Sequence, residues 1–195
     1  MRKIRIIEHI SLDGVIQQES SDDFVYGGWA THYRTPAGLD TVVEAYGSSF
    51  DLLLGRHTYD GLANFWPKAG DSPMANGLNA ATKYVVTHRP ENLEWTPVAS
   101  LGEDVMAGIR RLKLTNGPNL VVCGSSTLTS ILLDQGLVDE VVLIVYPILL
   151  GQGKRFFSDV DPCKLAFVGT KTTPTGVLLN TYRYVGSLRA ESPAK

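Results

Sequence analysis

The feature that most restricts the fold is a set of short apolar runs, each followed by a glycine or by polar residues. The clearest is "DLLLGRHTYDGL" at 51–62, where three leucines precede Gly55 and Arg56. Such a run is typical of a strand that is buried on both faces of a parallel sheet. The runs at 119–124 and 139–147 repeat the pattern. Because helical patterns separate these runs, we expect an α/β protein.

The remaining patterns complete a three-layer α/β sandwich. Further strands are predicted at 3–10, 83–87, 97–99, 164–172 and 177–184, the last two as an antiparallel hairpin on a mostly parallel sheet. Helices are predicted at 37–48, from about 58, from a capping box at Ser100–Glu103 to about 114, and from about 128 to Gly136. Residues 11–36 and 66–80 are expected to be irregular. We expect one domain over 1–195.

Composition argues against several classes of function. The formal net charge is −2 and basic residues do not cluster, which argues against a nucleic-acid partner. Cys123, Cys163 and the histidines show no spacing typical of metal ligands, and a reduced, cytoplasmic location is the simplest expectation. Charges and Pro147 interrupt the apolar residues near 137–150, so no membrane span is predicted.

Residues suited to phosphate follow three of the predicted strands. Gly55-Arg56-His57-Thr58 precedes a helix, whose first N–H groups favour an anion. Thr87-His88-Arg89 would suit a ribose 2′-phosphate, and Gly124-Ser125-Ser126-Thr127 joins a buried run to a helix. The ordinary alternatives are a surface ion pair, turn chemistry and a serine N-cap, respectively. Together the three segments predict a pocket for a phosphorylated cofactor at the carboxyl ends of the strands.

Four segments in this order make the chain resemble the dihydrofolate reductase-like family. They are "SLDG", "LLLGRHTYDGL", "VVCGSSTL" and "DEVVLIVYPILLGQGKRFF", and the resemblance covers about 3–184. The chain is most similar to the reductase domain of bacterial riboflavin biosynthesis and its stand-alone relatives. The resemblance implies NADPH across the carboxyl ends of the central strands. Its expected contacts are Gly55, Arg56, Thr58, Thr87, Gly124, Ser125, Ser126 and Thr127, with Arg89 as a further phosphate contact beside Thr87.

The resemblance also implies a small heterocyclic substrate beside the cofactor. Asp13 is the predicted catalytic residue, which orients or protonates the heterocycle, although Asp-Gly is also a common turn. Asp40 is the competing acid, because folate reductases carry theirs on the corresponding helix; it could instead favour the helix dipole. Trp29 and Tyr33 could stack on a planar ring. Gly151 lies in a loop that is expected to close over the site.

These features predict an NADPH-dependent reductase of a nitrogen heterocycle. The substrate class is a ribosylaminopyrimidine, as for 5-amino-6-(5-phosphoribosylamino)uracil reductase in riboflavin biosynthesis, or a pterin-like ring. A nucleotide- or flavin-binding protein without turnover stays open, because Val15 and Ser125 depart from the family pattern. A dimeric interaction module built on the final strands stays open too. The resemblance and the apolar 141–150 segment also predict a homodimer.

Overall fold

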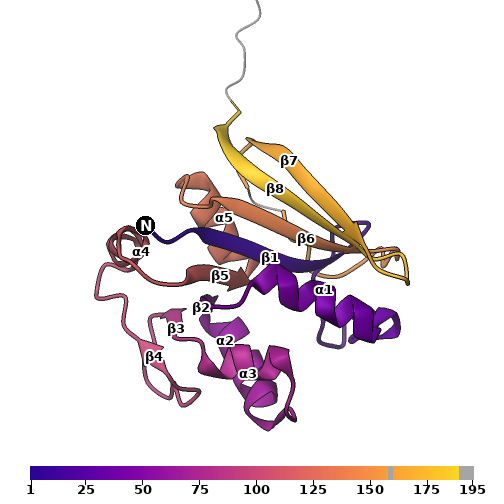
Figure 1. Ribbon diagram of the computed structural model, residues 1–195, viewed down its shortest axis with the longest axis horizontal. Helices are drawn as coiled ribbons and strands as arrows, with labels where there is room; N and C mark the ends of the chain where they lie inside the picture. The colour runs from indigo at the N-terminus through magenta and orange to yellow at the C-terminus, as the bar shows by residue number, and fades with distance from the viewer. Residues whose placement is uncertain (158–159, 189–195) are drawn as a thin grey trace, which may run out of the picture.

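In the computed structural model, which describes residues 1–157 and 160–188, the strands form one mixed sheet with helices on both faces (Figure 1). The strand order is β4-β3-β2-β5-β1-β6-β8-β7. The parallel strands are β1 (Ile4–Ser11), β2 (Phe50–Gly55), β3 (Lys83–Val86), β4 (Val98–Ala99), β5 (Asn119–Cys123) and β6 (Glu140–Tyr146). The hairpin of β7 (Cys163–Thr172) and β8 (Leu178–Ser187) joins β6 antiparallel. The predicted fold class is confirmed.

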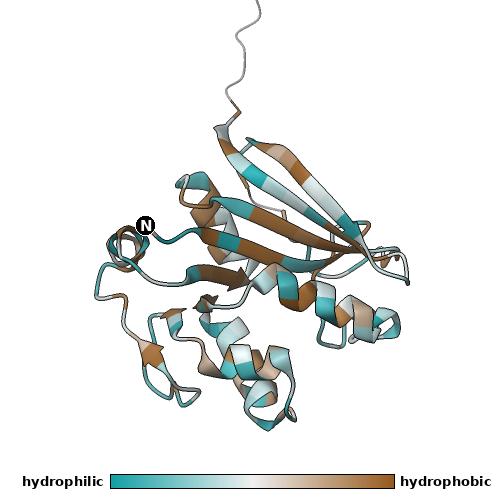
Figure 2. Ribbon diagram, viewed as in Figure 1, coloured by the Kyte–Doolittle hydropathy of each residue, from teal (hydrophilic) through white to brown (hydrophobic). Residues whose placement is uncertain are grey.

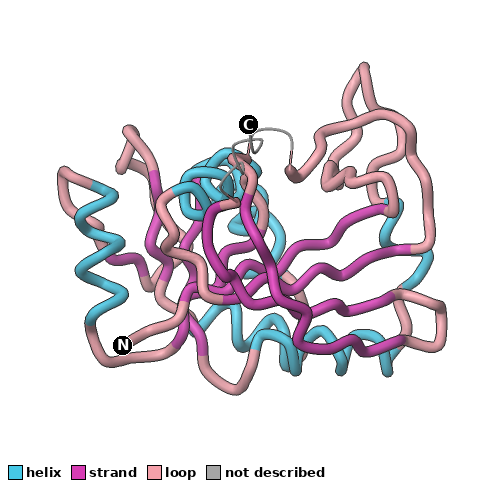
Figure 3. The backbone as a smooth tube through the Cα atoms, turned by 90° about the horizontal axis from the view of Figure 1, so that it is seen from above, coloured by secondary structure: helices cyan, strands magenta, loops and turns pink. Residues whose placement is uncertain are grey.

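Two hydrophobic cores lie on the two faces of the sheet. One face is covered by α1 (Pro36–Tyr46), α2 (Arg56–Phe65) and α3 (Pro73–Ala80), and the other by α4 (Val105–Leu114) and α5 (Ser126–Asp134). Figure 3 shows helices on both sides of the sheet, and Figure 2 shows the apolar inner strands between them. Leu52, Leu53 and Leu54 are fully buried because they alternate between the two cores. Within the described residues, none of the helices has the length and hydropathy needed to cross a membrane.

The expectation that 66–80 is irregular was wrong. This segment holds the short 3₁₀ helix η2 (Trp66–Lys68) and then α3. The Ser72 side chain accepts a hydrogen bond from the Ala75 N–H at 3.2 Å, and Pro73 occupies the first helical position. A serine cap followed by proline is a regular helix start, so the sequence did contain the signal. The long 12–35 segment, in contrast, is irregular apart from the 3₁₀ helix η1 (Trp29–Tyr33).

The predicted capping box at Ser100–Glu103 was also wrong. The N-cap of α4 is Asp104, whose Oδ1 accepts a hydrogen bond from the Ala107 N–H at 2.9 Å. Ser100 instead accepts one from the N–H of Gly102, which has a left-handed φ of 85°. This turn buries the Leu101 side chain in the core beside α4. A helix that began at Ser100 would not place Leu101 in this turn.

Most of the apolar 141–150 segment is part of the sheet, and the homodimer that this segment predicts stays a prediction. Its first half belongs to β6, which pairs with β1 on one side and with β8 on the other. Leu149, after β6, is 72% exposed, and apolar side chains are also exposed on the terminal hairpin, where Phe167, Val168 and Val185 are 63%, 61% and 56% exposed. The single domain over 1–195 stays a prediction, and 158–159 and 189–195 lie outside the described residues.

Gly108 provides a test of how α4 packs on the preceding turn. A Cβ at this position would overlap the carbonyl oxygen of Leu101. Alanine normally stabilises a helix interior by about 0.5–1 kcal/mol relative to glycine. Here we expect Gly108→Ala to lower the free energy of unfolding by about 1–3 kcal/mol, because the backbone must shift. Urea denaturation measures this change.

Gly61→Ala in α2 is the matched control. Its Cβ would meet only the Glu19 carboxylate, at 3.3 Å and at the end of a flexible, exposed side chain. We expect this variant to gain about 0.5–1 kcal/mol. Two stabilised variants would contradict the packing of α4.

Candidate active site

β2 and β5 are neighbouring interior strands, and their carboxyl ends lie side by side. A Cβ added at Gly55 would lie 2.9 Å from the Ser125 Oγ, and one at Gly124 would lie 3.4 Å from the Thr58 Oγ1. Gly124 and Ser125 both have left-handed φ angles, of 64° and 62°. The structure thus brings Gly55, Thr58, Gly124 and Ser125 together in what we call the strand-end cradle. Ser126 and Thr127 continue from it as the first residues of α5.

The first turn of α2 contributes free N–H groups to the cradle. α2 begins at Arg56, earlier than the expected start near 58, and Gly55 is its N-cap. Within the described part of the chain no side chain caps this helix. α5, in contrast, is capped by the Ser125 Oγ, which accepts a hydrogen bond from the Leu128 N–H at 3.3 Å. An uncapped ten-residue helix favours an anion at its N-terminus.

Arg56 is held by groups of the protein itself. Its Nε donates to both carboxylate oxygens of Asp60, at 2.8 and 3.0 Å. Its Nη1 donates to the carbonyls of Arg89 and Glu91, at 2.5 and 3.0 Å. The Thr87 hydroxyl bonds both the N–H and the carbonyl of Arg89. The ion pair weighed as the ordinary alternative for Arg56 is therefore present, and Arg56 also ties the loop after β3 to the cradle.

Asp13 fastens two loops together. Its Oδ1 accepts hydrogen bonds from the Ser11 hydroxyl at 2.6 Å and the Leu150 N–H at 3.1 Å, and its Oδ2 accepts one from the Gly151 N–H at 2.7 Å. The Ser11 hydrogen bond and the backbone donors lower the pKa of Asp13 to about 2. At neutral pH this carboxylate is ionised and has no proton to donate. Its catalytic role stays a prediction, which this geometry limits to orienting the loop or the substrate.

A cavity of about 650 Å³ opens between α1, the segment from η2 to α3, and the β1, β6 and β8 part of the sheet. Its volume is in the range of small-molecule sites. Its polar or aromatic lining consists of His9, Tyr33, Arg34, Thr35, Asp40, Tyr46, Phe65, Trp66, Asp71, Ser72, Tyr146 and Thr173. The Tyr46 hydroxyl lies 3.1 Å from the Sγ of Cys123, the residue before Gly124. This contact joins the cavity wall to the cradle.

The predicted substrate residues occupy different places. Tyr33 and Asp40 line the cavity. Trp29 is buried behind the wall, where its Nε1 donates to the Gln17 carbonyl at 2.7 Å and its ring packs edge-on against Tyr146. Gly151 is not part of the cavity lining, and its N–H is bound to Asp13. Trp29 therefore supports the wall, and Gly151 belongs to the loop that Asp13 holds.

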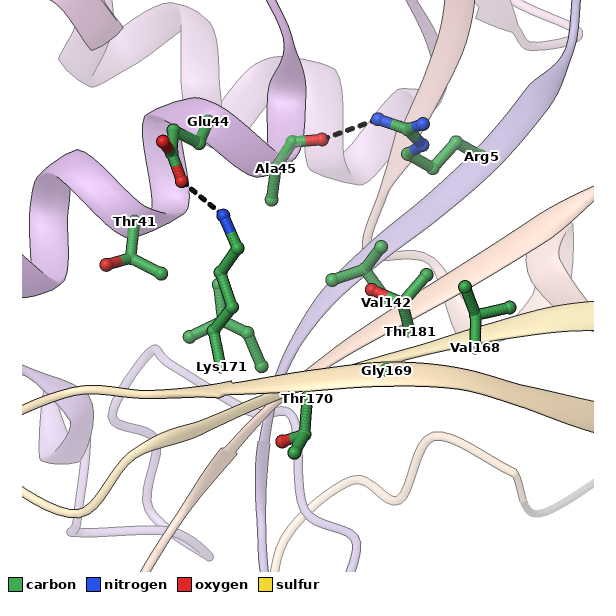
Figure 4. A pocket seen from close by; sticks show the side chains of 11 residues that line it. Arg5, Thr41, Glu44, Ala45, Val142, Val168, Gly169, Thr170, Lys171 and Thr181 are labelled. Atoms are coloured by element: carbon green, nitrogen blue, oxygen red, sulfur yellow. Dashed lines mark hydrogen bonds and ion pairs between the residues drawn. The ribbon is translucent and has the colours of Figure 1, made fainter.

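A smaller cavity of about 310 Å³ lies between α1 and the β7–β8 hairpin. Figure 4 shows that its two cations reach protein groups: Lys171 pairs with Glu44, and Arg5 donates to the Ala45 carbonyl. Arg5 also pairs with Glu140 at 2.7 Å. Because these charges are already paired, the larger cavity is the better candidate for a substrate site.

Glu8 is a site residue that the sequence reasoning missed. It lies on β1 and is only 7% exposed. Its Oε1 accepts a hydrogen bond from the His9 N–H, whereas its Oε2 has no partner among residues 1–157 and 160–188. The Oε2 lies 3.8 Å from the position of a Cβ on Gly124, so it faces the cradle. Burial raises the pKa of Glu8 to about 8, so the carboxyl group is mostly protonated at neutral pH. A buried carboxyl group with a free polar atom is typical of a functional site.

The cavity contains a pair of residues that was also missed, His9 on β1 and Tyr146 on β6. The His9 Nδ1 and the Tyr146 hydroxyl lie 2.7 Å apart, and both residues line the cavity. Both residues lie within predicted strands, where period-2 alternation gives the face of a side chain but not its cross-strand partner.

The Glu8 carboxyl group makes stability depend on pH. Above its ordinary pKa of 4.5 the unfolded chain ionises while the folded protein keeps the proton, so stability falls until about pH 8. We expect the free energy of unfolding of the wild type to fall relative to Glu8→Gln by up to about 1.4 kcal/mol per pH unit between about pH 5 and 8. Urea denaturation across this range measures the difference. A constant difference between the two proteins would contradict the raised pKa.

Known proteins resemble this chain in sequence and in fold. The family model described as the RibD C-terminal domain matches residues 2–179. The uncharacterized protein YwjB of Bacillus subtilis is 28% identical over 191 residues, covering 93% of this chain and 98% of that protein. A putative riboflavin biosynthesis protein from Shewanella sp. PV-4 has a TM-score of 0.65 at 21% identity, with 94% and 99% of the two chains covered.

The dihydrofolate reductase from Enterococcus faecalis, solved as a complex with NADP(H), has a TM-score of 0.61 at 19% identity, covering 93% of this chain and 96% of that one. The two solved structures confirm the dihydrofolate reductase-like fold. Because the family model extends from β1 into β8, the chain belongs to the RibD C-terminal domain family.

Proposed function

We propose that the protein is an NADPH-dependent reductase of a nitrogen heterocycle, either a ribosylaminopyrimidine or a pterin-like ring. The observation that carries this proposal is the large cavity beside the strand-end cradle, which Tyr46 and Cys123 connect. A dinucleotide that lies across strand ends needs such a cavity at its reactive end for the substrate. Membership of a reductase-like family and the NADP(H) complex of the Enterococcus faecalis enzyme support the proposal.

The cradle fits a dinucleotide phosphate. Glycines let the ends of β2 and β5 approach each other closely, and the first N–H groups of α2 are uncapped. The residues that would hold NADPH are Gly55, Arg56, Thr58, Thr87, Arg89, Gly124, Ser125, Ser126 and Thr127. When bound, the cofactor supplies the hydride, and the protein positions the substrate.

Arg56 can contact phosphate without giving up its protein partners. Its Nε and Nη1 are engaged, but its Nη2 makes no hydrogen bond to the described residues. We assign Nη2 to the cofactor phosphate. The bonds of Arg56 to Asp60 and to the 89–91 loop then hold the guanidinium in a fixed orientation, which reduces the entropy lost on binding.

The cavity fits a planar ring with polar edges. Tyr46, Trp66 and Tyr146 provide aromatic surface, and Tyr33 packs edge-on against Tyr146 with ring centroids 5.5 Å apart. We assign Asp40, on the α1 wall, to the N–H groups of the ring. Asp13 would act through the loop that contains Gly151 and not as a proton donor.

A nucleotide- or flavin-binding protein without turnover is the second candidate. It is favoured by Arg56 and Asp13, because both charged side chains are satisfied by groups of the protein. The two candidates share the pocket and differ in chemistry. Oxidation of NADPH in the presence of a dihydropterin or a ribosylaminopyrimidine would support the reductase, and binding without oxidation would support the alternative. A cytoplasmic location stays a prediction from the sequence.

Arg56 tests the placement of the cofactor. We expect NADPH to bind more tightly than NADH, because the 2′-phosphate can contact Arg56 and the Thr87–Arg89 turn. Arg56→Ala should weaken NADPH binding by about 1.5–3 kcal/mol, or about 10–150-fold, as for loss of a charge-assisted contact. Titration of tryptophan fluorescence measures both affinities. Arg110→Ala, on α4 and therefore on the other face of the sheet, is the control. Equal affinity for the two cofactors would argue against this placement.

We also propose that the protein is a homodimer that buries the exposed apolar residues of the terminal hairpin. Phe167 and Val168 lie on β7, an edge strand of the sheet, and exposed apolar side chains on an edge strand favour contact with another chain. Light scattering should give twice the chain mass, and Phe167→Glu combined with Val185→Glu should give a monomer. Val25→Glu, at a residue that is 69% exposed in the 12–35 segment, should leave the dimer intact. A monomeric wild type at micromolar concentration would overturn the proposal.

A further inference from the structure

The His9–Tyr146 pair is positioned by the register of β1 against β6. Ser11 is paired with Tyr146 and His9 with Ile144. His9 and Tyr146 therefore lie on the same face of the sheet, two residues apart in register. Their side chains meet with Nδ1 and the hydroxyl 2.7 Å apart and ring centroids 5.7 Å apart. Both face the 650 Å³ cavity. The pair is therefore part of the wall that a substrate would contact.

Reduction of a C=N bond needs a proton donor as well as a hydride. Asp13 is ionised and its oxygens are occupied by Ser11 and the 150–151 backbone. Glu8 carries a proton. Because it is next to His9 on β1, its side chain points to the opposite face of the sheet from that of His9. Glu8 does not line the cavity. The Tyr146 hydroxyl, in contrast, lies in the cavity wall and carries a proton.

We propose that Tyr146 is the proton donor of the reduction and that His9 is the residue that positions it. This inference rests on the proposed reductase function. The carbon of the substrate C=N bond receives hydride, with both electrons, from the dihydronicotinamide. The π electrons of the C=N bond move to nitrogen, which takes the proton from the Tyr146 hydroxyl. The products are a C–H and an N–H bond and the oxidised nicotinamide, and the tyrosinate regains a proton from water that enters the open cavity.

The electrostatics of the pair suit these roles. Burial raises the pKa of Tyr146 to about 12, although the Arg34 guanidinium opposes the rise, so the hydroxyl is protonated at neutral pH. Burial and the same guanidinium lower the pKa of His9 to about 4, so its ring is neutral. A neutral ring with its proton on Nδ1 donates to the Tyr146 oxygen and leaves the hydroxyl hydrogen free for the substrate. Arg34 then stabilises the tyrosinate as it forms.

Neighbouring rings hold Tyr146 in one orientation. Trp29 and Tyr33 pack edge-on against it, with centroids 5.2 and 5.5 Å away and interplanar angles of 89° and 70°. The titratable or charged groups that face Tyr146 are His9 from β1, Tyr33 and Arg34 from η1 and the residue after it, and Tyr46 from α1. Asp40 and Asp71 line the same cavity. Any pH profile must be interpreted against these groups.

Tyr146→Phe tests the proton donor. With NADPH and a dihydropterin as probes, we expect kcat to fall about 10²–10⁴-fold, as for loss of a general acid, while the affinity for NADPH is unchanged. Turnover by this variant should rise as the pH falls, because without the tyrosine hydroxyl the substrate nitrogen takes its proton from the solvent. Tyr84→Phe, at a half-buried residue of β3 that packs against the core on the other face, should keep wild-type kinetics.

His9 variants separate positioning from simple packing. An asparagine amide can replace the Nδ1–H donor, so His9→Asn should keep most of the turnover, whereas His9→Leu should lose it. The inference is overturned if Tyr146→Phe turns over like the wild type, if it loses NADPH affinity and turnover together, or if Asp40→Asn, and not Tyr146→Phe, is the variant whose turnover rises as the pH falls. The reductase proposal survives all three results. Both proposals are overturned if the wild-type protein binds NADPH but does not oxidise it in the presence of any of the heterocycles.

Discussion

The parallel pairing of β1 between β5 and β6 is the interaction on which both parts of the candidate site depend. On one side it pairs Ile7 with Cys123, which places Glu8 next to the cradle at Gly124. On the other it pairs Ser11 with Tyr146, which brings His9 and Tyr146 together. Because successive side chains of a strand point to opposite faces, a shift of one residue would exchange these two roles. One central strand therefore connects the proposed cofactor and substrate sites.

The loops around the site are held by each other's backbone groups. The Ile16 N–H donates to the Lys154 carbonyl, the Phe156 N–H donates to the Gly14 carbonyl, and Asp13 accepts two further N–H groups from residues 150 and 151. A loop as long as 12–35 can be ordered only if its polar groups find such partners. The charge of Asp13 is used for this purpose. The hydrogen bonds that Asp13 accepts explain why its pKa is low and why it has no proton to donate.

Burial keeps much of the site uncharged. Glu8 retains its proton, His9 loses one, and burial raises the pKa of the Cys123 thiol to about 12. Arg34 is therefore a cation beside largely neutral groups in the wall near Tyr146. Such a wall costs little desolvation when a flat, neutral ring enters it. It also allows a single positive charge to act on any anion that forms during a reaction.

The sequence by itself determined the α/β class, the terminal hairpin and the strands that carry the cradle. Apolar runs such as 52–54 are long enough, and punctuated clearly enough, to indicate buried strands without any knowledge of their neighbours. The start of α3 was also present in the sequence, as Ser72-Pro73. The glycines and hydroxyls of the cradle were visible because they follow those strands directly.

Only the tertiary structure decided which side chains meet. Neither the pairing of His9 with Tyr146 nor the position of Glu8 beside Gly124 could be predicted, because each depends on the register between strands far apart in the chain. The occupation of Asp13 by protein groups and the burial of Trp29 were hidden for the same reason, and the ion pair of Arg56 was visible only as one alternative. A local pattern gives the face on which a side chain lies, whereas its hydrogen bonds, its burial and hence its protonation state are set by residues that only the fold brings together.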